Sequence, residues 1–149
     1  MSEISKRVKS LLLAQKHGVL AVTDRATGIP YGALVNYVCN EKGMPIFLFS
    51  SLARHTQSLL VNPAASLLVA DLPVQGDILT GQRASFMGRC VRLETDNAVK
   101  ATYLVTHPYA AGYAQFSDFA FWQLKPELVH TVAGFGQIAT LRASDVLKT

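Results

Sequence analysis

Apolar residues recur at helical spacing at the start of the chain. Ile4, Val8, Leu11 and Leu12 fall on one face, basic residues occupy the remaining surface, and Gly18 follows as a stop signal. The pattern predicts an amphipathic helix within residues 1–16. A helix lying on a membrane surface is the alternative, but the apolar side carries no bulky aromatic residue. We therefore expect the helix to pack on its own domain.

From Gly18 onward the spacing of apolar residues is no longer helical. Short β-rich runs at residues 18–24, 31–39 and 44–50 are separated by turns that contain glycine, which predicts a three-stranded antiparallel meander. The next segment, residues 52–61, is poor in β-branched residues and ends before Pro63, so we expect a short helix there.

Residues 65–71 form a further predicted strand, apolar at every position from Leu67 to Ala70. Such a run is typical of a strand covered on both faces, and a small barrel has only one inner face. A second subunit is the economical cover, so we expect a homodimer.

The rest of the chain predicts a long strand over residues 83–95, a helix over 96–106 capped by Thr95 or Asp96, and two strands that pair around Pro126. The total is about seven antiparallel strands with three or four helices. The expected fold class is mostly β: a small β-barrel with flanking helices, because closing the sheet removes its exposed edges.

Composition limits the class of protein. The 149 residues suit a single domain, 1–149, and 50% apolar against 16% charged residues excludes a disordered chain. No stretch predicts a signal peptide or a membrane span, so we expect a soluble, cytoplasmic protein. A net charge of +4 suggests either an anionic ligand or no particular ligand at all. Because the basic residues form no stripe, the charge argues against nucleic acid as a partner. Cys39 and Cys90 have no metal-ligand spacing and are expected to be buried thiols.

The candidate binding residues lie where the predicted strand at residues 44–50 is followed by the next helix. A helix N-terminus offers unpaired N–H groups, and this one has an arginine fork and three hydroxyls close by. The residues are Ser50, Ser51, Arg54, His55 and Thr56. They could form a phosphate cradle. Alternatively, Ser51 caps the helix and Arg54 is simply solvated.

Two motifs, SLARHTQSLLVNPAASLLV and DFAFWQL…VHTVAGFG, decide the resemblance. Over about residues 16–139 the chain resembles the pyridoxamine 5′-phosphate oxidase-like FMN-binding split barrels, and within them the branch of haem-utilisation and haem-degrading proteins. The resemblance implies an FMN-binding split β-barrel, a homodimer and FMN at the subunit interface.

The resemblance also implies site residues. Arg54 and His55 match the basic pair that holds the FMN phosphate, with Thr56 and Ser50 or Ser51 completing the cradle. The segment beside the flavin ring matches Leu34, Val35, Asn36 and Tyr37, and weaker candidates are Gln82, Arg83 and Trp122. A lone tryptophan is also a common core residue.

The expected function is that of an FMN-dependent oxidoreductase acting on an unknown small-molecule substrate. The flavin would carry the chemistry, so no catalytic residue is predicted. LRASDVLKT at the end of the chain has no counterpart of the recognition tail of vitamin B6 oxidases. The alternative is a non-catalytic flavin- or haem-binding module, for which an axial ligand could come from His17, His55, His107 or His130.

Overall fold

The computed structural model describes residues 1–94, 97–134 and 136–147. Within these residues one antiparallel sheet of eight strands dominates the molecule. The strands are β1 (His17–Thr23), β2 (Pro30–Asn36), β3 (Val38–Cys39), β4 (Pro45–Ser50), β5 (Ala64–Asp71), β6 (Gln82–Arg92), β7 (Phe119–Ala133) and β8 (Ile138–Arg142). The predicted fold class, mostly β with flanking helices, is confirmed.

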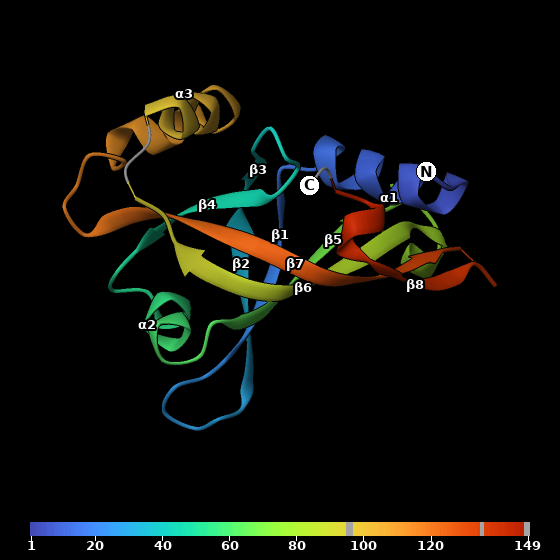
Figure 1. The fold of residues 1–149 in the computed structure, drawn as a ribbon, viewed down its shortest axis with the longest axis horizontal. Coiled ribbons are helices and arrows are strands. Elements are labelled where there is room, and N and C mark those ends of the chain that lie inside the picture. Colours follow the sequence, from blue (N-terminus) through green and yellow to red (C-terminus); the bar gives the residue numbers. More distant parts are fainter. Residues whose placement is uncertain (95–96, 135, 148–149) are drawn as a thin grey trace.

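The sheet is curled into a half-barrel. Its strand order is β2-β1-β5-β6-β7-β4-β3, with β8 added alongside β7. The two end strands of this order are consecutive in the chain, because β2 ends at Asn36 and β3 begins at Val38. Figure 1 shows the curled strands with the helices placed around them.

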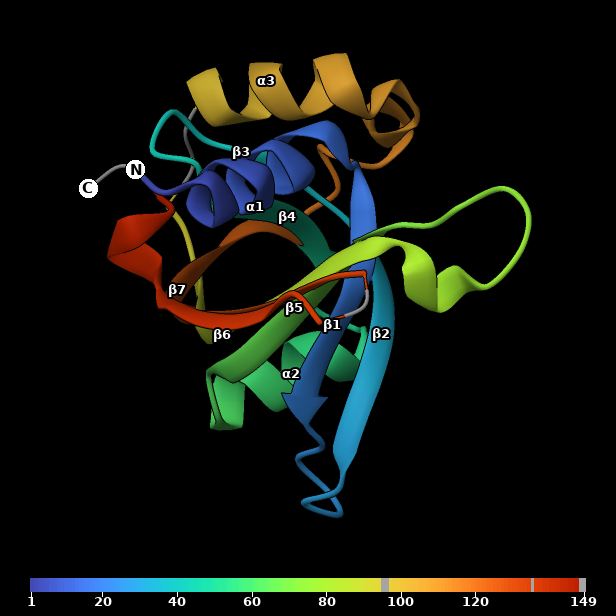
Figure 2. The ribbon, with the colours of Figure 1, turned by 90° about the vertical axis from the view of Figure 1, so that its right-hand side faces the viewer.

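Three α-helices flank the sheet in the described part of the chain: α1 (Glu3–Ala14), α2 (Arg54–Val61) and α3 (Asn97–Thr106). Short 3₁₀ helices follow as η1 (Ile78–Thr80), η2 (Pro108–Gly112) and η3 (Ala143–Asp145). In Figure 2, α1 and α3 lie on one side of the sheet and α2 on the other. None of the described helices is long and apolar enough to cross a membrane.

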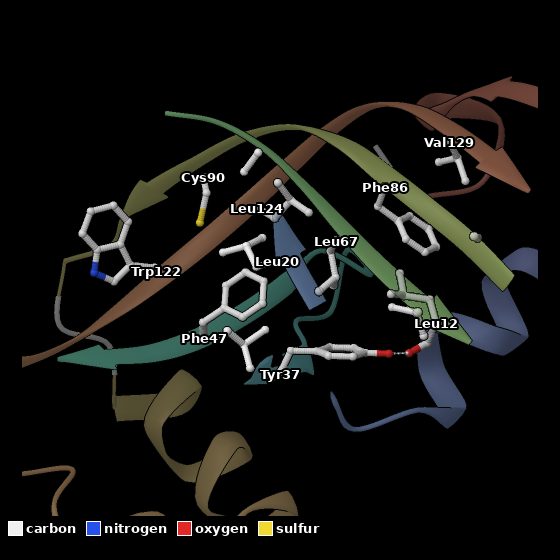
Figure 3. Close-up of a cluster of buried hydrophobic side chains, with 14 of the residues drawn as sticks. Leu12, Leu20, Tyr37, Phe47, Leu67, Phe86, Cys90, Trp122, Leu124 and Val129 are labelled. Carbon is white, nitrogen blue, oxygen red and sulfur yellow. Dashed lines mark hydrogen bonds between the residues drawn. The ribbon is translucent and has the colours of Figure 1, made fainter. Parts of the chain in front are cut away.

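The main core fills the concave side of the sheet. Fully buried residues from five strands meet there, and Figure 3 shows them converging: Leu20, Phe47, Leu67, Phe86 and Leu124. Burying one such side chain contributes about 1.5–3 kcal/mol. Helix α1 adds Leu12 to this core, and the Tyr37 hydroxyl donates a hydrogen bond to the carbonyl oxygen of Leu12. The predicted amphipathic helix is thus packed on its own domain.

A smaller apolar cluster packs α3 against β4 and β7. Tyr103, the one buried residue of α3, packs edge-on against Phe121 with 5.6 Å between the ring centroids. The expected caps of this helix, Thr95 and Asp96, lie outside the described residues.

The predicted meander is only partly correct. β1 and β2 form the expected hairpin, but β2 stops at Asn36, and β4 pairs with β7 instead of with β2. Tyr37 interrupts the run because its side chain turns into the core. The predicted second helix is correct in type and end, although it begins at Arg54 and not at Leu52.

The two strands expected around Pro126 are a single strand, so the predicted hairpin is wrong. β7 continues through Pro126 for 15 residues. Proline lacks the N–H that a central strand donates, and the register shifts between Met87 and Gly88 on the neighbouring strand β6. This bulge allows β7 to pass the proline without a break.

The cysteines behave as predicted. Both are free thiols, Cys39 half-buried and Cys90 buried. Burial raises the pKa of each thiol to about 12, so both stay protonated and unreactive at neutral pH.

Candidate functional site

The predicted phosphate cradle lies at the start of α2, but the hydroxyl of Ser50 is already hydrogen-bonded within the protein. Ser50 donates to the Asp118 carboxylate over 3.1 Å and accepts from the backbone N–H of Leu52. Ser51 is exposed and does not cap the helix, because the N-cap residue is Ala53, which makes no side-chain hydrogen bond.

Arg54 is paired with a buried carboxylate. Its Nε and Nη2 donate to the two oxygens of Asp24 over 2.6 and 3.0 Å, and Asp24 is only 4% exposed. Arg54 and Thr27 hold the pKa of Asp24 well below its usual range, so this carboxyl remains anionic. A phosphate at Arg54 would have to approach this negative charge.

His55 and Thr56 face the interior. The His55 ring meets Phe49 edge-on, with centroids 4.4 Å apart, and burial lowers its pKa. Neither His55 Nε2 nor Thr56 Oγ1 has a hydrogen-bond partner among the described residues. The five residues are close in sequence, but the structure does not present them together at an open anion site.

The other predicted site residues divide between core and surface. Val35, Tyr37 and Trp122 are buried in the main core, as Figure 3 shows for the two aromatic residues. Asn36 is exposed at the end of β2, opposite His17 of β1. Leu34 is 78% exposed on the convex side of the sheet, which we call the outer face.

A depression lined by described residues lies on this outer face. We call it the outer-face hollow, and its volume is about 540 Å³. It is lined by His17, Gly18, Val19, Leu34, Leu68, Ala70, Leu72, Ile78, Leu79, Arg83, Ala84, Ser85, His130 and Val132. Leu34 and Arg83, two of the residues predicted to bind a cofactor, are in this lining, whereas the cradle residues around Arg54 are not.

Strand register brings the lining together. Leu34 pairs with Val19, Val19 with Leu68, Leu68 with Ser85, and Ser85 with His130. Alternate residues of a strand point to the same side, so this row of side chains points outward from five neighbouring strands. A second row, on the same side, pairs Ala70 with Arg83 and Arg83 with Val132.

The loop between β5 and β6 forms one wall of the hollow. It projects from the sheet in Figure 2 and carries the exposed apolar residues Leu72, Ile78 and Leu79. Arg83 Nη1 donates to the carbonyl oxygens of Leu79 and Gly81 over 2.8 and 3.1 Å. These bonds fix both the base of the loop and the guanidinium group.

Two of the four histidines line the hollow. His130 is half-buried, and its Nδ1 lies 2.9 Å from the Thr140 hydroxyl on β8. His17 is exposed at the start of β1. His55 and His107 lie elsewhere, the latter 2.7 Å through Nε2 from the carbonyl oxygen of Tyr37. The sequence contained the alternation that points these strand residues outward, but only the register shows that they meet.

Comparison with known proteins identifies the family of this chain. The model of the CREG β-barrel matches residues 3–147. The chain belongs to the CREG β-barrel family. The non-canonical haem oxygenase HOZ, chloroplastic, of Arabidopsis thaliana is 36% identical over 132 residues, which are 87% of this chain and 40% of HOZ. The chain thus spans less than half of that relative's length.

Two further proteins that this chain is similar to are named for haem. The haem oxygenase HutZ of Vibrio cholerae is 25% identical over 150 residues, covering 97% of this chain and 84% of HutZ. A solved haem-binding protein from Mycobacterium smegmatis has a TM-score of 0.89 at 25% identity, over 98% of this chain and 60% of that one.

The predicted FMN cofactor is wrong in the light of these relatives, which are named for haem and not for flavin. The motifs behind the prediction belong to the split-barrel scaffold, and a scaffold does not fix the ligand. The pairing of Arg54 with Asp24 agrees with this correction, because it removes the strongest anion-binding group of the expected cradle.

Proposed function

We propose that this chain binds haem in the outer-face hollow. The observation that carries the proposal is the composition of the lining: apolar side chains from β1, β2, β5, β7 and the loop, with two histidines and one arginine. Apolar walls suit the porphyrin ring, an imidazole nitrogen is a common ligand of haem iron, and a guanidinium group pairs with a propionate. Haem, when bound, supplies a redox-active iron.

The relatives support haem over other planar ligands. HOZ and HutZ are named haem oxygenases, and the M. smegmatis protein is named a haem-binding protein. Arg83 supports the choice independently, because its Nη1 is held by the loop carbonyls, while no described residue accepts from its other guanidinium N–H groups, which could therefore bind an anion. Haem carries its two carboxylates at one edge, which suits a single cation on one side of the hollow.

The test is titration of the purified protein with haemin, followed by the Soret band. We expect saturation at one haem per chain. Leu79→Asp places a negative charge in the wall of the hollow at a side chain that is already 56% exposed, so the fold should persist. Loss of one apolar contact of about 1.5–3 kcal/mol predicts a roughly ten- to hundredfold weaker affinity.

Leu52→Asp is the matched control, because Leu52 is 77% exposed and does not line the hollow. It should leave haem affinity unchanged. Absence of a Soret shift in the parent protein, or equal weakening by both substitutions, would refute the proposal.

A second copy of the chain completes the proposed site. Val19, Leu34 and Leu68 leave an apolar stripe on the outer face, and these residues are 38%, 78% and 43% exposed. Next to the stripe, Ala21, Gly32 and Ser66 are paired across three strands and make a flat surface of small side chains. A partner's sheet could approach closely there and cover the open side of the hollow, as the apolar run from Leu67 to Ala70 predicts.

A further inference from the structure

The two histidines of the outer-face hollow cannot both bind the iron of one haem that lies against this face. His17 and His130 project from the same side of the sheet, since both belong to its outward-facing positions. Three strand-to-strand steps separate His130 from Val19, roughly 14 Å at about 4.8 Å each. His17 lies two residues further along β1. Two ligands of one iron must approach opposite sides of the porphyrin, so within one chain only one of them can bind.

The surroundings of the two rings differ. His130 is half-buried, and the Thr140 hydroxyl lies 2.9 Å from its Nδ1, on the adjacent strand β8. His130 and Thr140 are also direct partners in the β7–β8 register, so the hydrogen bond joins two fixed backbone positions. His17 is exposed, and its ring has no hydrogen-bond partner among the described residues.

We propose that His130 is the axial ligand of the haem iron through Nε2, and that Thr140 is its positioning residue; this rests on the proposed binding of haem. When Nδ1–H donates to the Thr140 hydroxyl, the Nε2 lone pair is free for the metal. Iron- and zinc-binding histidines usually donate their second ring N–H in this way, which fixes the tautomer and the orientation of the ring. An oriented ring also loses less conformational freedom on binding than the exposed ring of His17.

The experiment is resonance Raman spectroscopy of the ferrous haem-loaded protein, which detects the iron–histidine stretching band. His130→Ala should abolish the band, and added imidazole should restore it by occupying the vacated place. His17→Ala is the matched control, because it removes the other imidazole of the hollow, and it should retain the band.

Thr140→Val tests the positioning role. It removes the hydroxyl but keeps the shape and the β-branched side chain, so the band should shift and haem affinity should fall by about tenfold or more. Thr140→Ser restores a hydroxyl and should return both toward the parent values. A residue with a merely structural role would change stability in a urea titration without shifting the band.

The outcomes separate this inference from the proposed function. Haem binding with a band that persists in His130→Ala, or that is lost in His17→Ala instead, would overturn the assignment of His130 and leave haem binding intact. Haem binding by the parent protein without any iron–histidine band would do the same. Failure of the parent protein to bind haemin would instead remove the proposed function itself. Circular dichroism of each variant ensures that a lost band reflects a lost ligand and not an unfolded chain.

Discussion

Arg54 and Asp24 are 30 residues apart in the chain, and their pairing decides what each can do. An arginine at a helix start predicts an anion site when its neighbours in sequence are considered alone. In the fold, its two-pronged hydrogen bond is taken by a carboxylate that also accepts from the backbone N–H and hydroxyl of Thr27. The sequence identifies Arg54 as a group able to bind an anion, but the tertiary structure supplies Asp24 as its partner.

Asp24 gives a prediction about pH. Its pKa is lowered in the folded state, with Arg54 as the first cause, so the folded protein binds fewer protons than the unfolded chain near the usual aspartate pKa of about 3.9. The stabilisation is complete above that pH and is lost as the pH falls below it. We expect Asp24→Asn to reduce stability at pH 7 and to flatten the decline between pH 5 and 3, measured by urea unfolding at each pH.

Asp145→Asn is the control for this series, because Asp145 is 49% exposed and lies 3.7 Å from Arg142 at the surface. Surface ion pairs contribute little, so the parent decline should be retained. An acid decline as steep in Asp24→Asn as in the parent protein would contradict the role given to the Arg54–Asp24 pair.

At the scale of elements, the sequence predicts what depends on local periodicity. Val8, Leu11 and Leu12 are buried on the inner face of α1, as their spacing requires, and β5 alternates Leu67 and Val69 inward with Leu68 outward. The continuous strand β7 could not be predicted in this way, because the bulge beside Pro126 is defined only by the pairing with β6, where Met87 lies opposite Leu128 and Gly88 opposite Pro126. Proline is a local signal, whereas its accommodation depends on the neighbouring strand.

Gly88 tests this explanation of the long strand. A Cβ built there would lie 2.1 Å from the carbonyl oxygen of Lys125 and 2.8 Å from Cα of Pro126, so backbone would have to move. We expect Gly88→Ala to lower the free energy of unfolding by about 1–3 kcal/mol, which is typical of overpacking. Gly112→Ala, where a Cβ meets nothing within 4 Å, should change it by less than about 0.5 kcal/mol. Equal effects of the two substitutions in chemical denaturation would refute the close approach at the bulge.

The candidate site emerges only at the scale of the whole molecule. Its lining comes from β1, β2, β5, β6, β7 and the loop before β6, segments that stretch from His17 to Val132. Each strand contributes alternate residues, which the sequence indicates, but the order β2-β1-β5-β6-β7 determines which of them become neighbours. This is why Leu34 and Arg83 were identified singly as candidate cofactor residues while the hollow that they share with His130 was not.

The same face carries the prediction of a dimer. Leu34 is 78% exposed at the edge strand β2, and an apolar side chain so placed contributes little to the fold of one chain but much to contact with a second. We expect the protein without haem to have twice the chain mass of 16.2 kDa in light scattering at micromolar concentration. Leu34→Asp should return the monomer mass, since a buried unpaired charge opposes association. Leu52→Asp, equally exposed but away from the outer face, should remain dimeric; a monomeric parent protein, or a dimer that persists in Leu34→Asp, would rule out this interface.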